Sequence, residues 1–111
     1  SLAAFTYELT SSFPQSEQFG IVSQIRRCVV SVPSNIAEGC GRQHKKETIQ
    51  FLSIARGSLY ELETQPYISK DLSYITEDQL IVCLNKIENL GKLLNGFIRY
   101  NTEKKDLNKK N

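Results

Sequence analysis

A single histidine and three cysteines are the residues of this 111-residue chain whose types are best suited to holding a metal. They would supply the nitrogen and sulfur ligands that zinc prefers: His44, Cys28, Cys40 and Cys83. Their spacing matches no standard zinc pattern and includes no C-x-x-C pair. Buried thiols are the more common role for such cysteines, so we expect neither a metal nor a cofactor. An odd number of cysteines also argues against a disulfide framework and fits a reducing cytoplasm.

Groups for nucleophilic or phosphate chemistry are equally sparse. His44 lies in a cationic stretch with no adjacent nucleophile pattern, and no serine occupies a nucleophile elbow. The stretch from Gly39 to Gly41 lacks the third glycine and the preceding strand of a phosphate-binding loop. The sequence therefore predicts a protein that is not an enzyme.

Cationic residues are the candidate contacts for RNA or DNA. The densest cluster reads RQHKK, and the candidates are Arg26, Arg42, His44, Lys45 and Lys46. The formal net charge is only +2, so one copy carries an ordinary set of solvated charges. A symmetric assembly would repeat each cation and strengthen the field. No base-stacking aromatic side chain is interleaved with the cluster, so binding would be weakly sequence-specific.

A second polar set follows helical spacing through the segment that contains Pro33. We expect one ion pair between Arg27 and Glu61 and another between Glu38 and Arg42 at i,i+4 spacing. Such a line is often simply the solvated side of a helix. The alternative is a polar network between helices or between subunits, which fixes register and partner. The candidate members are Gln24, Arg27, Ser31, Asn35, Glu38, Arg56 and Glu61.

Four segments with apolar residues at helical spacing position these groups, and no segment shows sustained period-two alternation. The first carries Leu2, Phe5 and Leu9; the second, Pro14 to Cys40, carries Val22, Ile25, Val29, Val32, Ile36 and Cys40. The third, Gln43 to Asp71, carries Leu52, Ala55, Leu59 and Leu62, widened by Phe51 and Ile54. The fourth follows TEDQ and carries Leu80, Leu84, Ile87, Gly91, Leu94 and Ile98. The chain contains no methionine, so we expect the first helix to be the second half of a longer one.

Individual residues predict where these helices begin, bend and approach one another. Ser12 with Gln15, and Thr76 with Gln79, have capping-box spacing. The apolar stripe stays in phase across Pro33, which favours one kinked helix, whereas Pro66 should bend the third segment or end it early. Gly57, in a helix interior, indicates close approach by another backbone. A hairpin that pairs positions whose numbers sum to about 85 places Arg27 opposite residues 58–61 and Ser31 opposite Ile54 and Ala55.

Short connections between four amphipathic helices predict an all-α, antiparallel up-down four-helix bundle whose second helix is kinked at Pro33. We expect one domain over residues 1–103 and a polar tail over residues 104–111 that frays. No apolar run approaches the roughly 18 residues needed to span a bilayer. There is no secretory segment either, so we expect a soluble, cytoplasmic protein without membrane contact.

Two stretches, FPQSEQFGIVSQIRRCVVSVPSNIAEGCGR and FLSIARGSLYELETQ, closely resemble the bacterial 23S rRNA intervening-sequence protein family, also called the four helix bundle proteins. The resemblance covers roughly residues 9–74 and is weaker through the fourth segment; Pro66 replaces a usual leucine. It implies an all-α bundle, often a ring-shaped pentamer, encoded by a gene that can lie inside a 23S ribosomal RNA gene. More distantly the chain resembles the accessory variability proteins of diversity-generating retroelements, basic pentamers that bind nucleic acid and a reverse transcriptase.

Two functions remain open at this point. One is a homo-oligomer, a pentamer by the family resemblance, that binds RNA or DNA through basic surfaces repeated by symmetry. The other is a protein-interaction scaffold oligomer without direct nucleic-acid contact. The second is favoured by more apolar surface than one bundle needs, in Tyr60, Tyr67, Ile81, Leu90 and Phe97.

Overall fold

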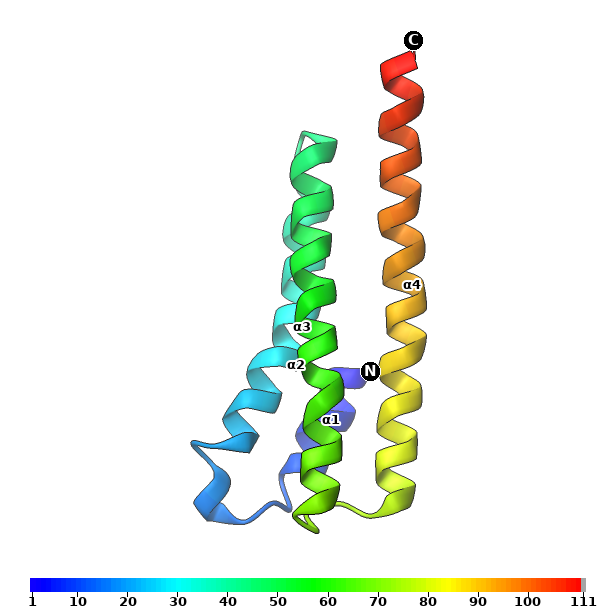
Figure 1. Ribbon diagram of the computed structural model, residues 1–111. Helices are drawn as coiled ribbons and strands as arrows, with labels where there is room; N and C mark the ends of the chain where they lie inside the picture. Colours follow the sequence, from blue (N-terminus) through cyan, green and yellow to red (C-terminus); the bar gives the residue numbers. More distant parts are fainter. Residues whose placement is uncertain (111) are drawn as a thin grey trace.

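Helices of unequal length make up the fold, and their directions alternate (Figure 1). α1 spans Leu2–Thr10, α2 spans Ile21–Cys40, α3 spans Lys45–Asp71 and α4 spans Glu77–Lys110; a short 3-10 helix, η1, spans Gln15–Glu17. The computed structural model describes the backbone of residues 1–110 and the side chains of residues 1–103. These residues form no strand, and the predicted all-α, up-down four-helix bundle is confirmed.

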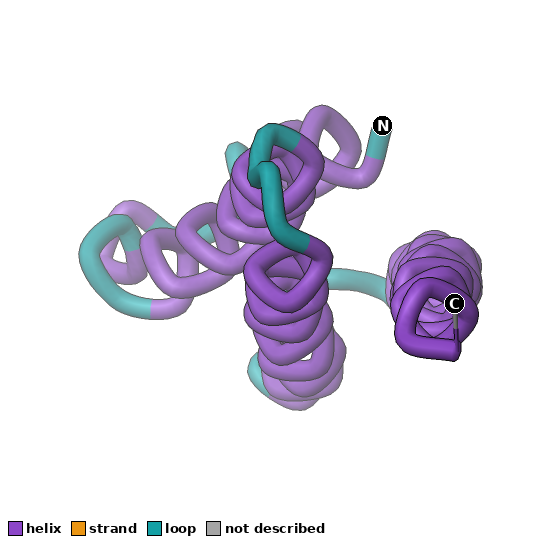
Figure 2. The backbone as a smooth tube through the Cα atoms, turned by 90° about the horizontal axis from the view of Figure 1, so that it is seen from above, coloured by secondary structure: helices purple, strands orange, loops and turns teal. Residues whose placement is uncertain are grey.

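The long α2–α3 hairpin and α4 carry most of the packing. α3 packs against α2 and α4, while the short α1 contacts α2 and α4 on the other side. Seen along the bundle, α4 stands apart from the α2–α3 hairpin (Figure 2), and among the described residues α3 and α1 are the helices that contact both α2 and α4. The molecule is elongated, 56 Å by 24 Å by 18 Å, and α4 continues beyond the α2–α3 turn (Figure 1).

The core follows the apolar stripes that the sequence predicts. Each fully buried aliphatic side chain contributes about 1.5–3 kcal/mol to folding, and the buried members are Val22, Ile25, Val29, Val32, Leu52, Ala55, Leu59, Leu62, Leu80, Ile87 and Leu94. Two assignments to the core are wrong. Cys40 is exposed at the end of α2, where Gly39 takes the buried position, and Ile54 is 48% exposed because it lies on the flank of α3.

α2 begins seven residues later than the sequence predicts, at Ile21 rather than Pro14. Pro14 instead precedes η1, and Gly20 is the N-cap of α2. The expected capping box at Ser12 does not form, because the Ser12 hydroxyl donates backward to the Leu9 carbonyl at 3.1 Å. Phe13, buried against Tyr74 with ring centroids 5.2 Å apart, anchors this connection to the loop between α3 and α4.

Both interior prolines lie within continuous helices. α2 runs through Pro33, as the unbroken apolar stripe predicts, and the kink at this residue stays a prediction. α3 runs through Pro66 to Asp71, so the expectation that this proline ends the helix early is wrong. Pro66 is buried, and its packing against the bundle offsets the loss of one backbone hydrogen bond.

The start of α4 confirms the second capping box. The Gln79 amide nitrogen donates to the Thr76 hydroxyl at 3.1 Å, and the Thr76 amide nitrogen donates to Gln79 Oε1 at 2.8 Å. At the other end, α4 continues to Lys110. The domain boundary at residue 103 and the fraying of the tail stay predictions. Asn111 lies outside the described residues.

Among the glycines, Gly39 rather than Gly57 is the one that another helix approaches most closely. A Cβ on Gly39 would lie 3.1 Å from the Thr48 carbonyl oxygen and 3.1 Å from the Phe51 Cβ. The Thr48 hydroxyl donates to the Gly39 carbonyl at 2.9 Å and joins the end of α2 to the start of α3 beside the turn. Gly57 is exposed, and a Cβ there would have no atom of this chain within 4 Å, so the expected close approach is absent within one copy.

The hairpin register differs from the prediction by about one helical turn at Ser31. Its hydroxyl lies 2.8 Å from that of Ser58, rather than opposite Ile54 and Ala55. Side chains lean toward the N-terminus of their own helix, so in an antiparallel pair they lean past each other and meet at displaced positions. Arg27 reaches Glu61 with the same displacement, at the far end of its predicted range.

We predict that Gly39→Val destabilises the protein by about 1–3 kcal/mol, because the new side chain forces α2 away from Thr48 and Phe51. Chemical denaturation measures the change. Gly96→Ala is the control, since a Cβ there has no atom within 4 Å and alanine is the better helix former. Equal stabilities of the two variants would contradict the role of Gly39.

Candidate nucleic-acid interface

Cationic side chains gather around the turn between α2 and α3. Arg42, His44 and Lys46 are exposed there, and Lys45 is half-buried. Lys45 Nζ donates to Asn101 Oδ1 at 3.2 Å, which ties the turn to the upper half of α4. Asn101 is itself buried and donates to the Phe97 carbonyl at 2.9 Å. Arg99 is exposed nearby on α4, so two elements contribute to one basic end.

Arg42 is held in place but keeps its charge accessible. Its guanidinium bonds Glu38 Oε2 at 2.7 Å, as the i,i+4 spacing predicts, and its side chain remains 40% exposed. It also lies over the Phe51 ring, 4.7 Å from the centroid. Cation–π contact and an ion pair on one guanidinium fix its direction, so this cation projects from a defined position at the turn.

The two ends of the bundle carry opposite charge. We call the end formed by residues 38–47 and 99–103 the basic end; it holds Arg42, Lys45, Lys46 and Arg99 against Glu38, Glu47 and Glu103. The sequence after residue 103 adds four lysines and one aspartate. The acidic end, residues 8–20 and 63–78, holds one lysine against Glu8, Glu17, Glu63, Asp71, Glu77 and Asp78. A net charge of +2 therefore conceals a strong asymmetry along the molecule.

Arg26 does not belong to the basic end. It lies sixteen residues before Arg42 on α2, a separation of about 24 Å along a helix. Its Nε donates to the Thr10 hydroxyl at 3.1 Å, and its guanidinium lies over the Tyr7 ring, 4.6 Å from the centroid. Arg26 thus joins α1 to α2 away from the basic end, and its contact with nucleic acid stays a prediction.

The polar residues of α2 form two separate groups against α3. In the first, Arg27 donates to Glu61 Oε1 at 2.8 Å and to Gln24 Oε1 at 3.1 Å, which confirms the predicted ion pair. In the second, Asn35 Nδ2 donates to the Ser31 hydroxyl at 3.0 Å, and that hydroxyl contacts Ser58. The members are exposed or half-buried, so this candidate network lies at the α2–α3 junction.

Arg56 departs from this junction because it points to α4, where its Nη1 donates to Asn95 Oδ1 at 3.2 Å. Three polar partners were not predicted from the sequence: Ser58, Asn95 and Asn101. Polar residues that lie between the apolar positions of an amphipathic helix usually belong to its solvated side, so nothing marks these three as contacts. Asn101 had one available signal, since it continues the stripe of Leu94 and Ile98 at helical spacing.

The three thiols differ in environment. Burial raises the pKa of Cys83 to about 11. Burial also raises the pKa of Cys28, with the nearby Glu61 carboxylate adding to the effect. Gln65 Nε2 lies 3.7 Å from the Cys28 sulfur, while the buried Gln65 Oε1 has no hydrogen-bond partner. Cys40 is exposed, and the described residues bring no three His, Cys, Asp or Glu side chains together as a metal site.

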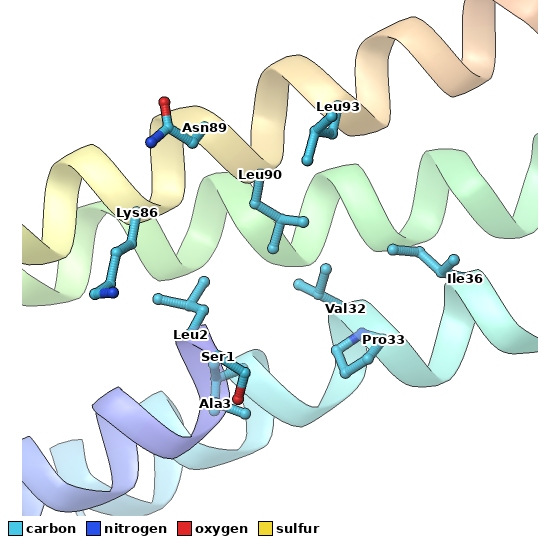
Figure 3. Close-up of a pocket in the computed structure, with 11 residues that line it drawn as sticks. Ser1, Leu2, Ala3, Val32, Pro33, Ile36, Lys86, Asn89, Leu90 and Leu93 are labelled. Atoms are coloured by element: carbon cyan, nitrogen blue, oxygen red, sulfur yellow. The ribbon is translucent and has the colours of Figure 1, made fainter.

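An apolar groove lies between α2 and α4, beside the first residues of α1. Its volume is about 500 Å³, and the side chains of Leu2, Val32 and Leu90 point toward one another across it (Figure 3). Pro33 and Ile36 form the α2 wall, and Leu93, 72% exposed, stands on the α4 side.

No helix in the part of the chain that the structure describes is long and apolar enough to cross a membrane.

The Arg27–Glu61 ion pair should contribute little to folding. Its side chains are 57% and 47% exposed, so solvent screens the attraction. A double-mutant cycle with Arg27→Ala and Glu61→Ala is expected to give a coupling energy of about 0.2–1 kcal/mol. Chemical denaturation measures the four stabilities, and a coupling energy of several kcal/mol would contradict this account.

The buried thiol of Cys83 predicts a loss of stability at alkaline pH. Its pKa is raised on folding, so its contribution is complete below about pH 9 and is lost as the pH rises toward about 11. Between pH 8 and pH 10.5, wild type should lose about 2 kcal/mol more unfolding free energy than Cys83→Ala, which lacks the thiol. Urea denaturation at both pH values measures this, and parallel losses in the two proteins would refute it.

Comparisons with known proteins agree with this architecture. The family model described as 23S rRNA-intervening sequence protein matches residues 1–96. A crystal structure of a protein of unknown function from the S23 ribosomal protein family of Bacteroides thetaiotaomicron superposes with a TM-score of 0.78. It is 24% identical and covers 88% of each chain, which supports the fold. No curated protein matches. Because the family model covers most of the chain, the protein belongs to the 23S rRNA-intervening sequence protein family.

Proposed function

We propose that this chain is a non-enzymatic, cytoplasmic protein that assembles with copies of itself and binds RNA through the basic end. The single observation that carries the proposal is the placement of the α2–α3 turn beside α4. The Lys45–Asn101 hydrogen bond joins the two elements, which puts the turn cations and Arg99 at the same end of the molecule. Phosphate recognition requires such cations and little else.

The proposed ligand is the ribose-phosphate backbone rather than the bases. Phe51, the aromatic side chain beside the turn, lies under Arg42, whereas Tyr100 on α4 is 56% exposed. Contacts from cations to phosphates bind by counterion release, which is strongly salt-dependent and carries little sequence information. Self-assembly, as a pentamer by family resemblance, would repeat the basic end and multiply the field.

Charge reversal at the turn tests the proposal. Lys45→Glu with Lys46→Glu should weaken binding to a ribosomal RNA fragment roughly tenfold at low salt. The slope of the logarithm of the binding constant against the logarithm of the salt concentration should become shallower by about 1 to 1.5. Filter binding at two salt concentrations measures both quantities. The control is Lys86→Glu with Lys92→Glu, the same charge change on exposed residues in the middle of α4.

Equal losses in the test and control variants would mean that overall charge, not the basic end, attracts RNA. Unchanged binding in the turn variant would reject the proposal. Circular dichroism of each variant excludes unfolding, which matters because Lys45 also bonds Asn101.

A protein-interaction scaffold is the second candidate, and the apolar groove between α1, α2 and α4 favours it (Figure 3). Leu93 leaves more apolar area in water than a closed bundle requires. An RNA-free role predicts that wild type shows no salt-sensitive retention on generic RNA, whereas Leu93→Lys abolishes capture of the protein partner. The two functions are thus separable by the same set of variants.

A further inference from the structure

One row of residues on α3 lies opposite its buried stripe and faces neither α2 nor α4. The row, at steps of four and three residues, consists of Lys46, Gln50, Ser53, Gly57, Tyr60, Thr64, Tyr67 and Asp71. Every position in this row is exposed or half-buried. α3 packs only on α2 and α4, and its outer side lies open at the edge of the bundle (Figure 2). We call this row the outer face of α3.

Gly57 lies in the middle of the outer face and has no use within one copy. A glycine in a helix interior weakens the helix relative to alanine. Outside the adjoining turns of α3 itself, no atom of a described residue comes within 4 Å of a Cβ built there, so neither packing nor a turn requires the glycine. Three residues later, Tyr60 leaves 54% of its surface in water. Gly57, which has no side chain, and Tyr60, whose large side chain is exposed, are therefore neighbours on the outer face.

We propose that a second copy of this chain covers the outer face, with the two α3 helices antiparallel about a two-fold axis. In the register centred between Gly57 and Tyr60, each tyrosine ring packs on the bare backbone of Gly57 in the other copy. The same contact is made twice, as an isologous interface requires. Ile54 and Ile68, each 48% exposed, flank the seam and add apolar surface.

The charges of the outer face select the same register. Lys46 near the N-terminus of α3 meets Asp71 near its C-terminus, so the two copies form an ion pair at each end. Between these ends, Gln50 meets Tyr67 and Ser53 meets Thr64. A shift by one heptad leaves Lys46 or Asp71 without its counterpart. Size and charge complementarity thus agree on one alignment of about 37 Å of helix.

This contact deepens the proposed self-assembly, on which it rests, by naming a face. A five-membered ring closes through head-to-tail contacts, whereas a two-fold contact joins copies in pairs. The outer face would therefore link two rings, or make a dimer on its own, and the assembly would hold an even number of chains. Lys46 belongs to both surfaces, whereas Arg42 and Lys45 of the basic end lie outside the outer face.

Gly57→Gln tests the contact directly. The long side chain is tolerated in one copy because its surroundings are open, yet it fills the hole that receives Tyr60. The dissociation constant of the pair should rise at least tenfold, or the mass from light scattering should halve, while thermal stability holds or rises. Gly96→Gln is the matched control, a helix-interior glycine with equally open surroundings on α4, and it should leave the assembly intact.

A charge swap provides an independent test. Lys46→Glu and Asp71→Lys should each raise the dissociation constant about tenfold, and the double variant should restore it. Assembly that survives Gly57→Gln unchanged, or a double variant no better than either single, would overturn the face while leaving self-assembly standing. A wild type that stays monomeric at about 0.2 mM would overturn both.

Discussion

The approach of Gly39 to Thr48 and Phe51 is the constraint on which the rest of the molecule depends. It lets α2 and α3 meet at the closed end of their hairpin, and the Thr48 hydroxyl fastens that end to the Gly39 carbonyl. Everything further along the pair follows in register, including the Ser31–Ser58 contact and the Arg27–Glu61 ion pair. The same hairpin sets the α2–α3 turn beside α4 and turns the outer face of α3 toward solvent.

The lengths of the helices explain which surfaces are available for function. α1 contacts α2 and α4, and apolar side chains such as Leu90 and Leu93 line a groove beside its first residues. α4 has 34 residues and passes the α2–α3 turn, and its Asn101 accepts a hydrogen bond from Lys45 of that turn. Unequal helices thus separate an apolar surface at mid-height from a cationic surface at one end.

Apolar spacing predicted the helices and most of the core, because burial follows a 3.6-residue period that single residues rarely override. Local polar chemistry was also predictable where both partners lie close in sequence, as for Thr76 with Gln79 and Glu38 with Arg42. Contacts between helices were not. Gly39 and Gly57 look alike in sequence, and Arg26 looks as free as Lys46, because only the packing angle decides which neighbour each one meets.

A rod with opposite charge at its two ends has a large electric dipole moment, whatever its small net charge. In the field of a long polyanion, the torque that orients such a rod is large while the net attractive force on it is still small. The torque turns the α2–α3 turn toward the polyanion and the Pro14 end away from it, so encounters begin aligned. Mobile ions shorten the distance over which this steering acts to about 8 Å at physiological ionic strength.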